Sequence, residues 1–235
     1  LMASGAVLAF KLGSGAIEDQ IAGMKAAIIF YSVLTILMGV LSFFFVKDDK
    51  MEKSDRVTFK GIGELLRMPA VWIISMVTFC NYVFTQMYYY LTPYMTELLG
   101  AAVVAGAFLA SSRRWFSLFG NVGGGFITDK VGTGRMLLIS FLVMAAGVVV
   151  IMMLPLDPSS TTIFVILYII IYIFYNVNYA MTWAMMDEGA IPERLSGSAA
   201  GIISTIGYLP EIFCSLLAGN WLENDPGVGG YRTIF

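Results

Sequence analysis

Apolar runs long enough to cross a membrane recur along this chain. The six complete runs cover residues 24–46, 69–95, 101–128, 136–154, 162–186 and 197–222. A transmembrane helix needs about 20 apolar residues, because the hydrocarbon core of a bilayer is about 30 Å thick. Charged residues make up only 13% of the 235 residues, whereas a soluble domain carries roughly 25%. We therefore expect an all-α integral membrane bundle, with six complete transmembrane helices and a partial helix at each end.

The composition excludes several classes of function. The chain has no histidine, which removes His-based catalytic triads and His metal sites. It has no nucleophile motif and no paired carboxylates inside an apolar run, so we expect no enzymatic activity, no metal and no other cofactor. Its net charge of −2 argues against nucleic acid as a partner, because nucleic-acid binding needs clustered Lys and Arg.

Basic residues are distributed unequally between the two ends of the predicted helices. Loops 47–67, 129–135 and 187–196 share one end and carry nine of them: Lys47, Lys50, Lys53, Arg56, Lys60, Arg67, Lys130, Arg135 and Arg194. The connections at the other end carry two, Lys25 and Arg232. The positive-inside rule therefore places the first three loops in the cytoplasm.

The longest polar stretch divides the chain. Residues 47–68 are expected to be a cytoplasmic linker between residues 1–46, the end of a first helical half, and residues 69–235, a second half. The sequence begins inside one apolar stretch and ends as another begins. We expect a piece of a longer chain, monomeric when complete, in which the preceding helical half is the partner of this one.

A glycine-rich stretch with a charged turn follows the run 101–128. Gly120 and Gly124 are spaced for close helix packing in lipid. The next residues fit the pattern G-x-x-x-D-[RK]-x-G through Gly125, Asp129, Lys130 and Gly132, and Arg135 lies three residues further on.

This motif resembles the signature loop of the Major Facilitator Superfamily, which repeats it between the second and third helices after the central linker. The resemblance covers essentially the whole sequence, and it implies the end of helix 5, helices 6 to 11 and the start of helix 12. The stretches GGGFITDK, IGYLPEIF and DPGVGGY, with Arg113, look most like bacterial nitrate/nitrite-porter-like members. The resemblance implies a multi-pass protein of a bacterial inner membrane.

The motif loop has two interpretations. The resemblance implies a latch that holds one conformation of a rocking transporter. Alternatively, Lys130 and Arg135 anchor the turn to lipid headgroups, while Asp129 accepts hydrogen bonds from a neighbouring helix start. In place of the basic residues that often follow the motif directly in the family, this chain has Thr133 and Gly134.

Arg113 and Arg114 are the only charged residues between 98 and 128. Arg113 lies sixteen residues before Asp129, roughly 24 Å along a helix from the cytoplasmic turn, and with helix tilt this is near the bilayer centre. An arginine that faces lipid there costs about 3 kcal/mol, so these side chains must face a polar cavity or a partner. Adjacent helical residues point about 100° apart, which predicts that only one of them faces the substrate. The resemblance favours Arg113, although both arginines can also be structural.

Glu211 is the only carboxylate deep within an apolar run. It follows Pro210, and together with Gly207 this proline predicts a helix kink. Glu211 can carry a coupling proton, or it can neutralise one of the arginines. Both roles stay open at this point.

Two helices offer polar linings for a cavity, and the resemblance implies that they are helices 7 and 10, which line the central cavity. In the run 162–186, polar and aromatic residues recur in steps of three and four: Tyr168, Tyr172, Asn176, Tyr179 and Trp183. In the run 69–95 the candidates are Asn81, Thr85, Gln86 and Tyr89.

These features predict a secondary active transporter that moves a small solute, an anion, by alternating access in the lipid bilayer. Coupling to protons and exchange are both open. The alternative is a facilitator or drug exporter of the same fold for neutral or lipophilic solutes, in which the arginines are structural.

Overall fold

The computed structural model describes residues 17–45 and 59–235, and every regular element in these two ranges is helical. The chain divides into two compact units, residues Leu1–Arg56 and Val57–Phe235. The boundary between the units falls inside the polar stretch 47–68.

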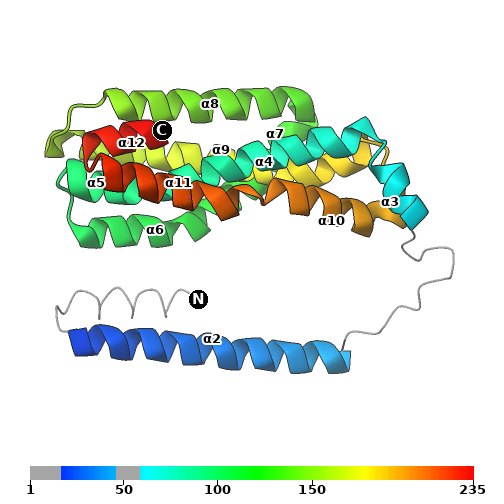
Figure 1. The fold of residues 1–235 in the computed structure, drawn as a ribbon, viewed down its shortest axis with the longest axis horizontal. Coiled ribbons are helices and arrows are strands. Elements are labelled where there is room, and N and C mark those ends of the chain that lie inside the picture. Colours follow the sequence, from blue (N-terminus) through cyan, green and yellow to red (C-terminus); the bar gives the residue numbers. More distant parts are fainter. Residues whose placement is uncertain (1–16, 46–58) are drawn as a thin grey trace. The chain divides into compact units, whose positions relative to one another are not determined.

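The described part of the first unit is one long helix, α2 (Ile17–Phe45) (Figure 1). Its segment Ile28–Phe45 is long and apolar enough to cross a membrane, and none of that segment is buried. A helix that is apolar on all sides requires protein or lipid around it. The partial helix expected near the N-terminus lies outside the described residues.

The second unit is a helical bundle (Figure 1). Its α-helices are α3 (Phe59–Leu65), α4 (Pro69–Tyr89), α5 (Leu91–Leu98), α6 (Val103–Leu118), α7 (Gly124–Val131), α8 (Thr133–Met153), α9 (Thr161–Glu188), α10 (Ser196–Gly207), α11 (Pro210–Asn224) and α12 (Val228–Ile234). Pro69 and Pro210 begin α4 and α11, where a proline leaves no helical hydrogen bond unmade.

Five helical segments of the described chain can cross a membrane by length and composition. Besides Ile28–Phe45 they are Pro69–Leu98, Thr133–Met153, Pro158–Glu188 and Glu193–Asn224. The sixth expected span, 101–128, is not among them. It forms a continuous helical run over 103–131 that contains Arg113, Arg114, Asp129 and Lys130.

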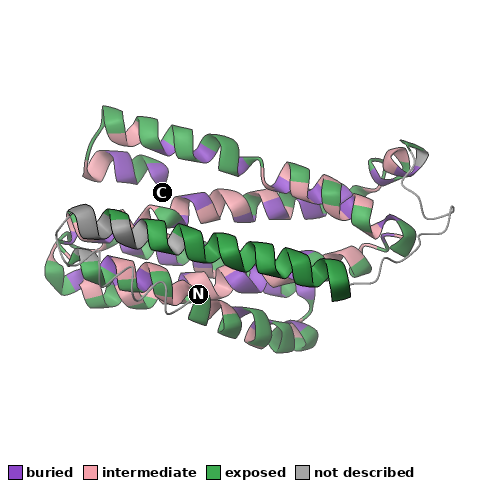
Figure 2. Cartoon of the chain, turned by 90° about the horizontal axis from the view of Figure 1, so that it is seen from below, coloured by how far each residue is buried: buried purple, intermediate pink, exposed green. Residues whose placement is uncertain are grey.

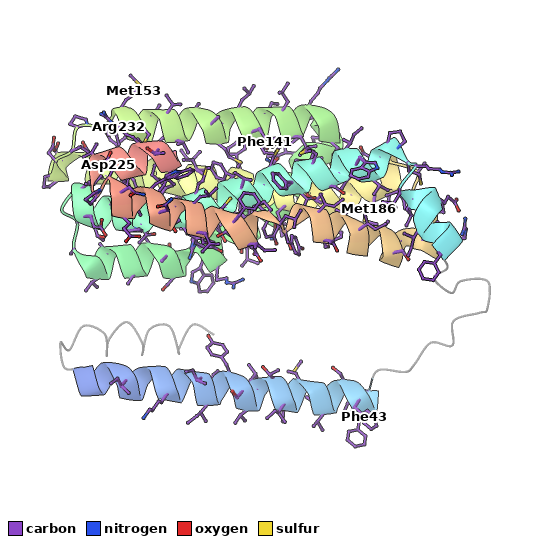
Figure 3. The ribbon with its side chains drawn as sticks, in the orientation of Figure 1. Phe43, Phe141, Met153, Met186, Asp225 and Arg232 are labelled. Carbon is purple, nitrogen blue, oxygen red and sulfur yellow. The ribbon has the colours of Figure 1, made fainter. Side chains whose placement is uncertain are left out.

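Helix α9 lies at the centre of the second unit and packs against α4, α6 and α8. Buried residues concentrate where the helices of this unit face one another (Figure 2). Apolar side chains on the outer faces stay exposed, as Met153 does at the end of α8 with 78% of its surface accessible (Figure 3). An exposed apolar surface of this kind suits a lipid environment.

Close contact between α9 and the run 103–131 depends on two glycines. A Cβ atom on Gly120 would lie 2.6 Å from the Ile173 carbonyl oxygen, and one on Gly124 would lie 2.6 Å from the Val177 side chain. Real Cβ contacts are not this short, so only glycine fits at either position. The close packing predicted from the spacing of these two glycines is confirmed.

Two irregularities interrupt the long helices near the middle of the bundle. The run 103–131 contains one wide π-helical turn, η2 (Phe119–Gly123), and such turns are frequent at functional sites. Between α10 and α11 the helix breaks at Tyr208 and Leu209. Gly207 fits tightly there, since a Cβ atom would lie 2.4 Å from Thr78 Cγ2. The predicted kink near Pro210 is therefore confirmed.

Candidate functional site

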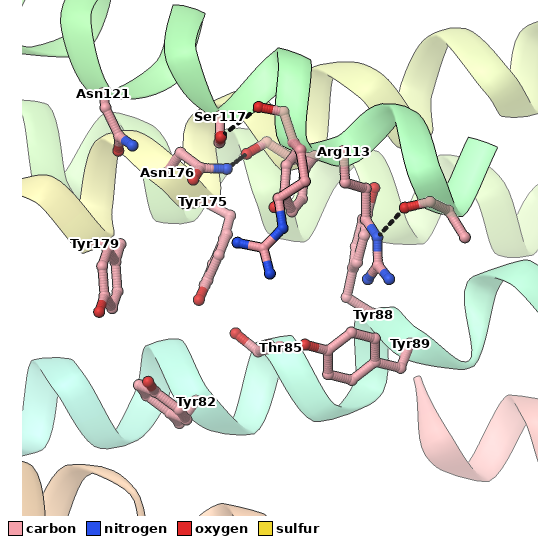
Figure 4. Close-up of a pocket in the computed structure, with 13 residues that line it drawn as sticks. Tyr82, Thr85, Tyr88, Tyr89, Arg113, Ser117, Asn121, Tyr175, Asn176 and Tyr179 are labelled. Atoms are coloured by element: carbon pink, nitrogen blue, oxygen red, sulfur yellow. Dashed lines mark hydrogen bonds between the residues drawn. The ribbon is translucent and has the colours of Figure 1, made fainter. Parts of the chain in front are cut away.

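A cavity of about 350 Å³ lies between α4, the run 103–131 and α9 (Figure 4). Its wall is almost entirely polar and aromatic, with six tyrosines, two arginines and two asparagines among the lining residues. The lining residues are Tyr82, Thr85, Tyr88, Tyr89, Ala110, Arg113, Arg114, Ser117, Asn121, Tyr172, Tyr175, Asn176 and Tyr179. A polar cavity halfway along helices of membrane-spanning length is a feature of proteins that move solutes across bilayers.

Helix α4 forms one wall of the cavity. Tyr82, Thr85 and Tyr89 recur at steps of three and four, so they share a face of the helix. The neighbouring Tyr88 is buried, and its hydroxyl donates a hydrogen bond to the Tyr168 carbonyl at 2.9 Å. Tyr88 thus ties α4 to α9 and has no free hydroxyl proton for a ligand.

Helix α9 forms the second wall, through Tyr172, Tyr175, Asn176 and Tyr179. The three rings follow one another along the helix, with centroids 5.9 Å apart for Tyr172 and Tyr175 and 6.3 Å apart for Tyr175 and Tyr179. The Asn176 amide donates to the Tyr172 carbonyl at 2.8 Å, which leaves its carbonyl oxygen free to accept.

The α9 stripe differs from the predicted one at three positions. Tyr168 is buried in the core with 1% of its surface accessible, and Trp183 is 40% exposed and outside the cavity lining. Tyr175, which was not among the predicted residues, does line the cavity. Its spacing of three residues from Tyr172 and four from Tyr179 was the signal that could have identified it.

The two arginines of α6 reach the same cavity, although their adjacent positions predicted that only one would face it. Long side chains that leave a helix about 100° apart can converge on a groove between their directions. The Arg113 Nε donates to the Ala110 carbonyl at 2.9 Å, and its guanidinium carbon lies 4.8 Å from the centroid of the Tyr89 ring (Figure 4). This distance is in the range of a cation–π interaction.

Neither arginine is neutralised by an acid. In residues 17–45 and 59–235 the one ion pair joins Arg194 and Glu64, at 2.7 Å, and both of these side chains are about half exposed. The cavity therefore carries two positive charges and no carboxylate in its described lining. Arginine keeps its proton at any ordinary pH, so these charges are permanent.

Three other predicted residues lie outside this cavity. Asn81 is 1% exposed on α4, and its side-chain amide has no hydrogen-bond partner in the described structure. Gln86 faces α11 instead, where its amide oxygen accepts a hydrogen bond from the Ser215 hydroxyl at 3.3 Å. Glu211 is exposed in the first turn of α11 and forms no ion pair with either arginine in the described structure.

The motif loop is a very short turn between α7 and α8. Gly132 is its single non-helical residue, with φ of +91°, a conformation that favours glycine. Gly125, Asp129, Lys130 and Arg135 are all exposed. Thr133, at the position where the chain departs from the family pattern, donates a hydrogen bond to the Glu188 carboxylate at the end of α9. The role of this loop as a conformational latch stays a prediction.

Membrane-length helices around a polar cavity define the chain as part of a multi-pass membrane protein. The chain belongs to the Major Facilitator Superfamily, whose family description matches residues 2–214. Members of this family are transporters and not enzymes. In the described part of the chain, no three His, Cys, Asp or Glu residues are grouped as metal ligands.

Two curated proteins of Escherichia coli K12 are similar to this chain. Inner membrane protein YqcE is 27% identical over 227 residues, which are 92% of this chain and 53% of YqcE. Inner membrane protein YihN is 27% identical over 224 residues, which are 91% of this chain and 53% of YihN. The chain thus spans about half the length of these relatives. No solved structure matches it.

Proposed function

We propose that the protein to which this chain belongs is a secondary active transporter that moves a small anion by alternating access. The observation that carries the proposal is the pair Arg113 and Arg114 in one cavity without a neutralising acid in the described structure. Two permanent charges inside a membrane are costly unless a partner balances them. A bound anion supplies that balance. The names of both relatives support a location in the bacterial inner membrane.

Helix α11 offers a group for coupling. Glu211 is not bonded to Arg113 or Arg114, so we favour a coupling proton on this carboxylate over a role as their fixed counter-ion. Its place beside the break between α10 and α11 supports this, because a carboxylate at a helix break can change its surroundings when the helices move.

The second candidate is a transporter of neutral or lipophilic solutes. The six tyrosines of the cavity favour it, because their rings suit such a solute. The anchoring of Arg113 by Ala110 and Tyr89 also favours it, because this anchoring fits a structural arginine. Arg114 argues against it, since this exposed side chain makes no hydrogen bond or ion pair in the described part of the chain.

Uptake into proteoliposomes, with the protein expressed from its full gene, tests the proposal. Arg113→Ala and Arg114→Ala, tested singly, are expected to reduce uptake of a labelled anion about tenfold or more, because a charge-assisted hydrogen bond contributes about 1.5–3 kcal/mol. Arg232→Ala, an exposed arginine outside the cavity, serves as the control and should leave uptake unchanged. Anion uptake that survives both cavity substitutions would contradict the proposal.

A further inference from the structure

We infer that the anion has a ring-shaped organic body, which Tyr175 and Tyr179 hold while Arg113 and Arg114 hold its charged head. This inference rests on the proposed function, because it specifies the kind of anion that the same cavity accepts. It also departs from the nitrate/nitrite-porter likeness of the sequence, which favours an anion as small as nitrate or nitrite.

The size of the cavity is the first reason. Its volume is about 350 Å³, whereas one water molecule occupies about 30 Å³ of the liquid. Pockets that hold organic ligands have volumes of roughly 300–1,000 Å³. An anion as small as nitrate would fill a minor part of this space and would leave the tyrosine walls without a partner.

The geometry of Arg113 fixes how the head binds. Its Nε is already used by the Ala110 carbonyl, and one face of its guanidinium lies near the Tyr89 ring. The two terminal nitrogens remain, and they form a planar fork that matches two oxygens of a carboxylate, sulfonate or phosphate. Arg114 lines the same cavity and supplies a second positive charge to this head.

The tyrosines of α9 provide a surface for the body. Tyr172 and Tyr179 lie seven positions apart, about 10 Å along the helix, and with Tyr175 between them the three rings form a continuous series. In Figure 4 the Tyr175 hydroxyl is directed toward Thr85, and the Tyr179 hydroxyl toward Tyr82 on the opposite wall. Tyrosine combines a rigid apolar face with a polar tip, so such a wall suits an aromatic ring or a hydroxylated ring.

Tyr82 is itself held in place. Its ring lies 4.2 Å, centroid to centroid, from the ring of Tyr208, the residue at the break between α10 and α11. The side of the cavity away from Arg113 is therefore lined by aromatic side chains of α4 and α9, and Tyr208 supports Tyr82 from behind.

Binding to the purified protein from the full gene tests the inference. Dissociation constants are measured for two anions without a ring, nitrate and acetate, and for two anions with a ring, benzoate and glucuronate. We expect the ring-bearing anions to bind about tenfold more tightly or better, since aromatic contacts add to the burial of the ring. Tyr175→Ala should weaken benzoate binding about tenfold and leave acetate binding nearly unchanged. Tyr175→Phe keeps the ring and should therefore retain the affinity for benzoate.

Phe108→Ala is the matched control, because Phe108 is an aromatic residue of α6 that is 75% exposed and outside the cavity lining. Nitrate that binds as tightly as benzoate would overturn the inference while leaving anion transport in place. If Tyr175→Ala weakens the binding of all four anions equally, the inference is also overturned, because the tyrosine would then act on the head group or on the fold. If none of the four anions binds, both the inference and the proposed anion transport fail.

Discussion

Arg113 and Arg114 carry the same charge, but the protein restrains them to different degrees. Arg113 is half-buried, bonded through Nε to Ala110 and placed over Tyr89. Arg114 is exposed, and its guanidinium makes no such contact in the described structure. A restrained donor loses less conformational entropy when a ligand binds. We therefore assign the orientation of the head group to Arg113 and a more adaptable contact to Arg114.

Gly120 sets the distance between the arginine-bearing helix and α9. Gly120→Ala is expected to destabilise the protein by about 1–3 kcal/mol, because the new methyl group would press on the backbone carbonyl of Ile173, which cannot move aside easily. Thermal unfolding of the purified protein in detergent measures the effect. Gly123→Ala is the matched control, since no heavy atom lies within 4 Å of a Cβ there. Equal stability of the two variants would show that the helices are not in close contact at Gly120.

The sequence predicted single residues well where they obey a helical period. The Gly120 and Gly124 spacing, and Tyr172, Asn176 and Tyr179 on one face, needed only that period. Gln86 was expected to line the cavity but faces α11, because the direction of a side chain depends on how α4 is turned against α9 and α11. The convergence of Arg113 and Arg114 on one cavity was also unpredictable, since a sequence pattern does not show how a long, flexible side chain bends.

At the level of elements, the break between α10 and α11 followed from Gly207 and Pro210, which each weaken a helix for a known reason. The π-helical turn at Phe119–Gly123 could not be predicted from the sequence, because no residue type enforces such a turn. This turn lies between the arginines and the motif loop. One extra residue in a turn rotates the helix that follows, so it sets which residues of α7 face α9.

Glu211 tests whether the broken helix takes part in coupling. Glu211→Gln is expected to abolish accumulation driven by a pH gradient and to preserve exchange of labelled for unlabelled solute, because the amide cannot carry a proton. Both rates are measured in proteoliposomes. Glu223→Gln, an exposed carboxylate near the end of the same helix, is the control and should keep both activities. An unchanged pH dependence of accumulation in Glu211→Gln would remove the coupling role.

For the whole molecule, composition and apolar runs predicted the class of protein, because lipid allows so few backbone structures. The membership in the Major Facilitator Superfamily agrees with the motif that ends in Asp129, Lys130 and Gly132. The cavity needed the structure, since its three walls come from segments nearly 100 residues apart, from Tyr82 to Tyr179. Anion transport through this bundle requires that the cavity be positively charged and open to a solute.

Thiol modification measures that charge without knowledge of the substrate. Asn121 lines the cavity, so Asn121→Cys, in a background with Cys80→Ser and Cys214→Ser, reports on the potential there. An anionic methanethiosulfonate should react about tenfold faster than a cationic one, because a cleft with charge of one sign concentrates the opposite ion. Ser159→Cys, exposed outside the cavity, should show no preference for the anionic reagent.

Adding Arg113→Gln and Arg114→Gln to the Asn121→Cys protein should then abolish the preference. If the thiol of Asn121→Cys reacts equally fast with both reagents, or faster with the cationic one, the cavity is not positively charged and the proposed anion site is contradicted.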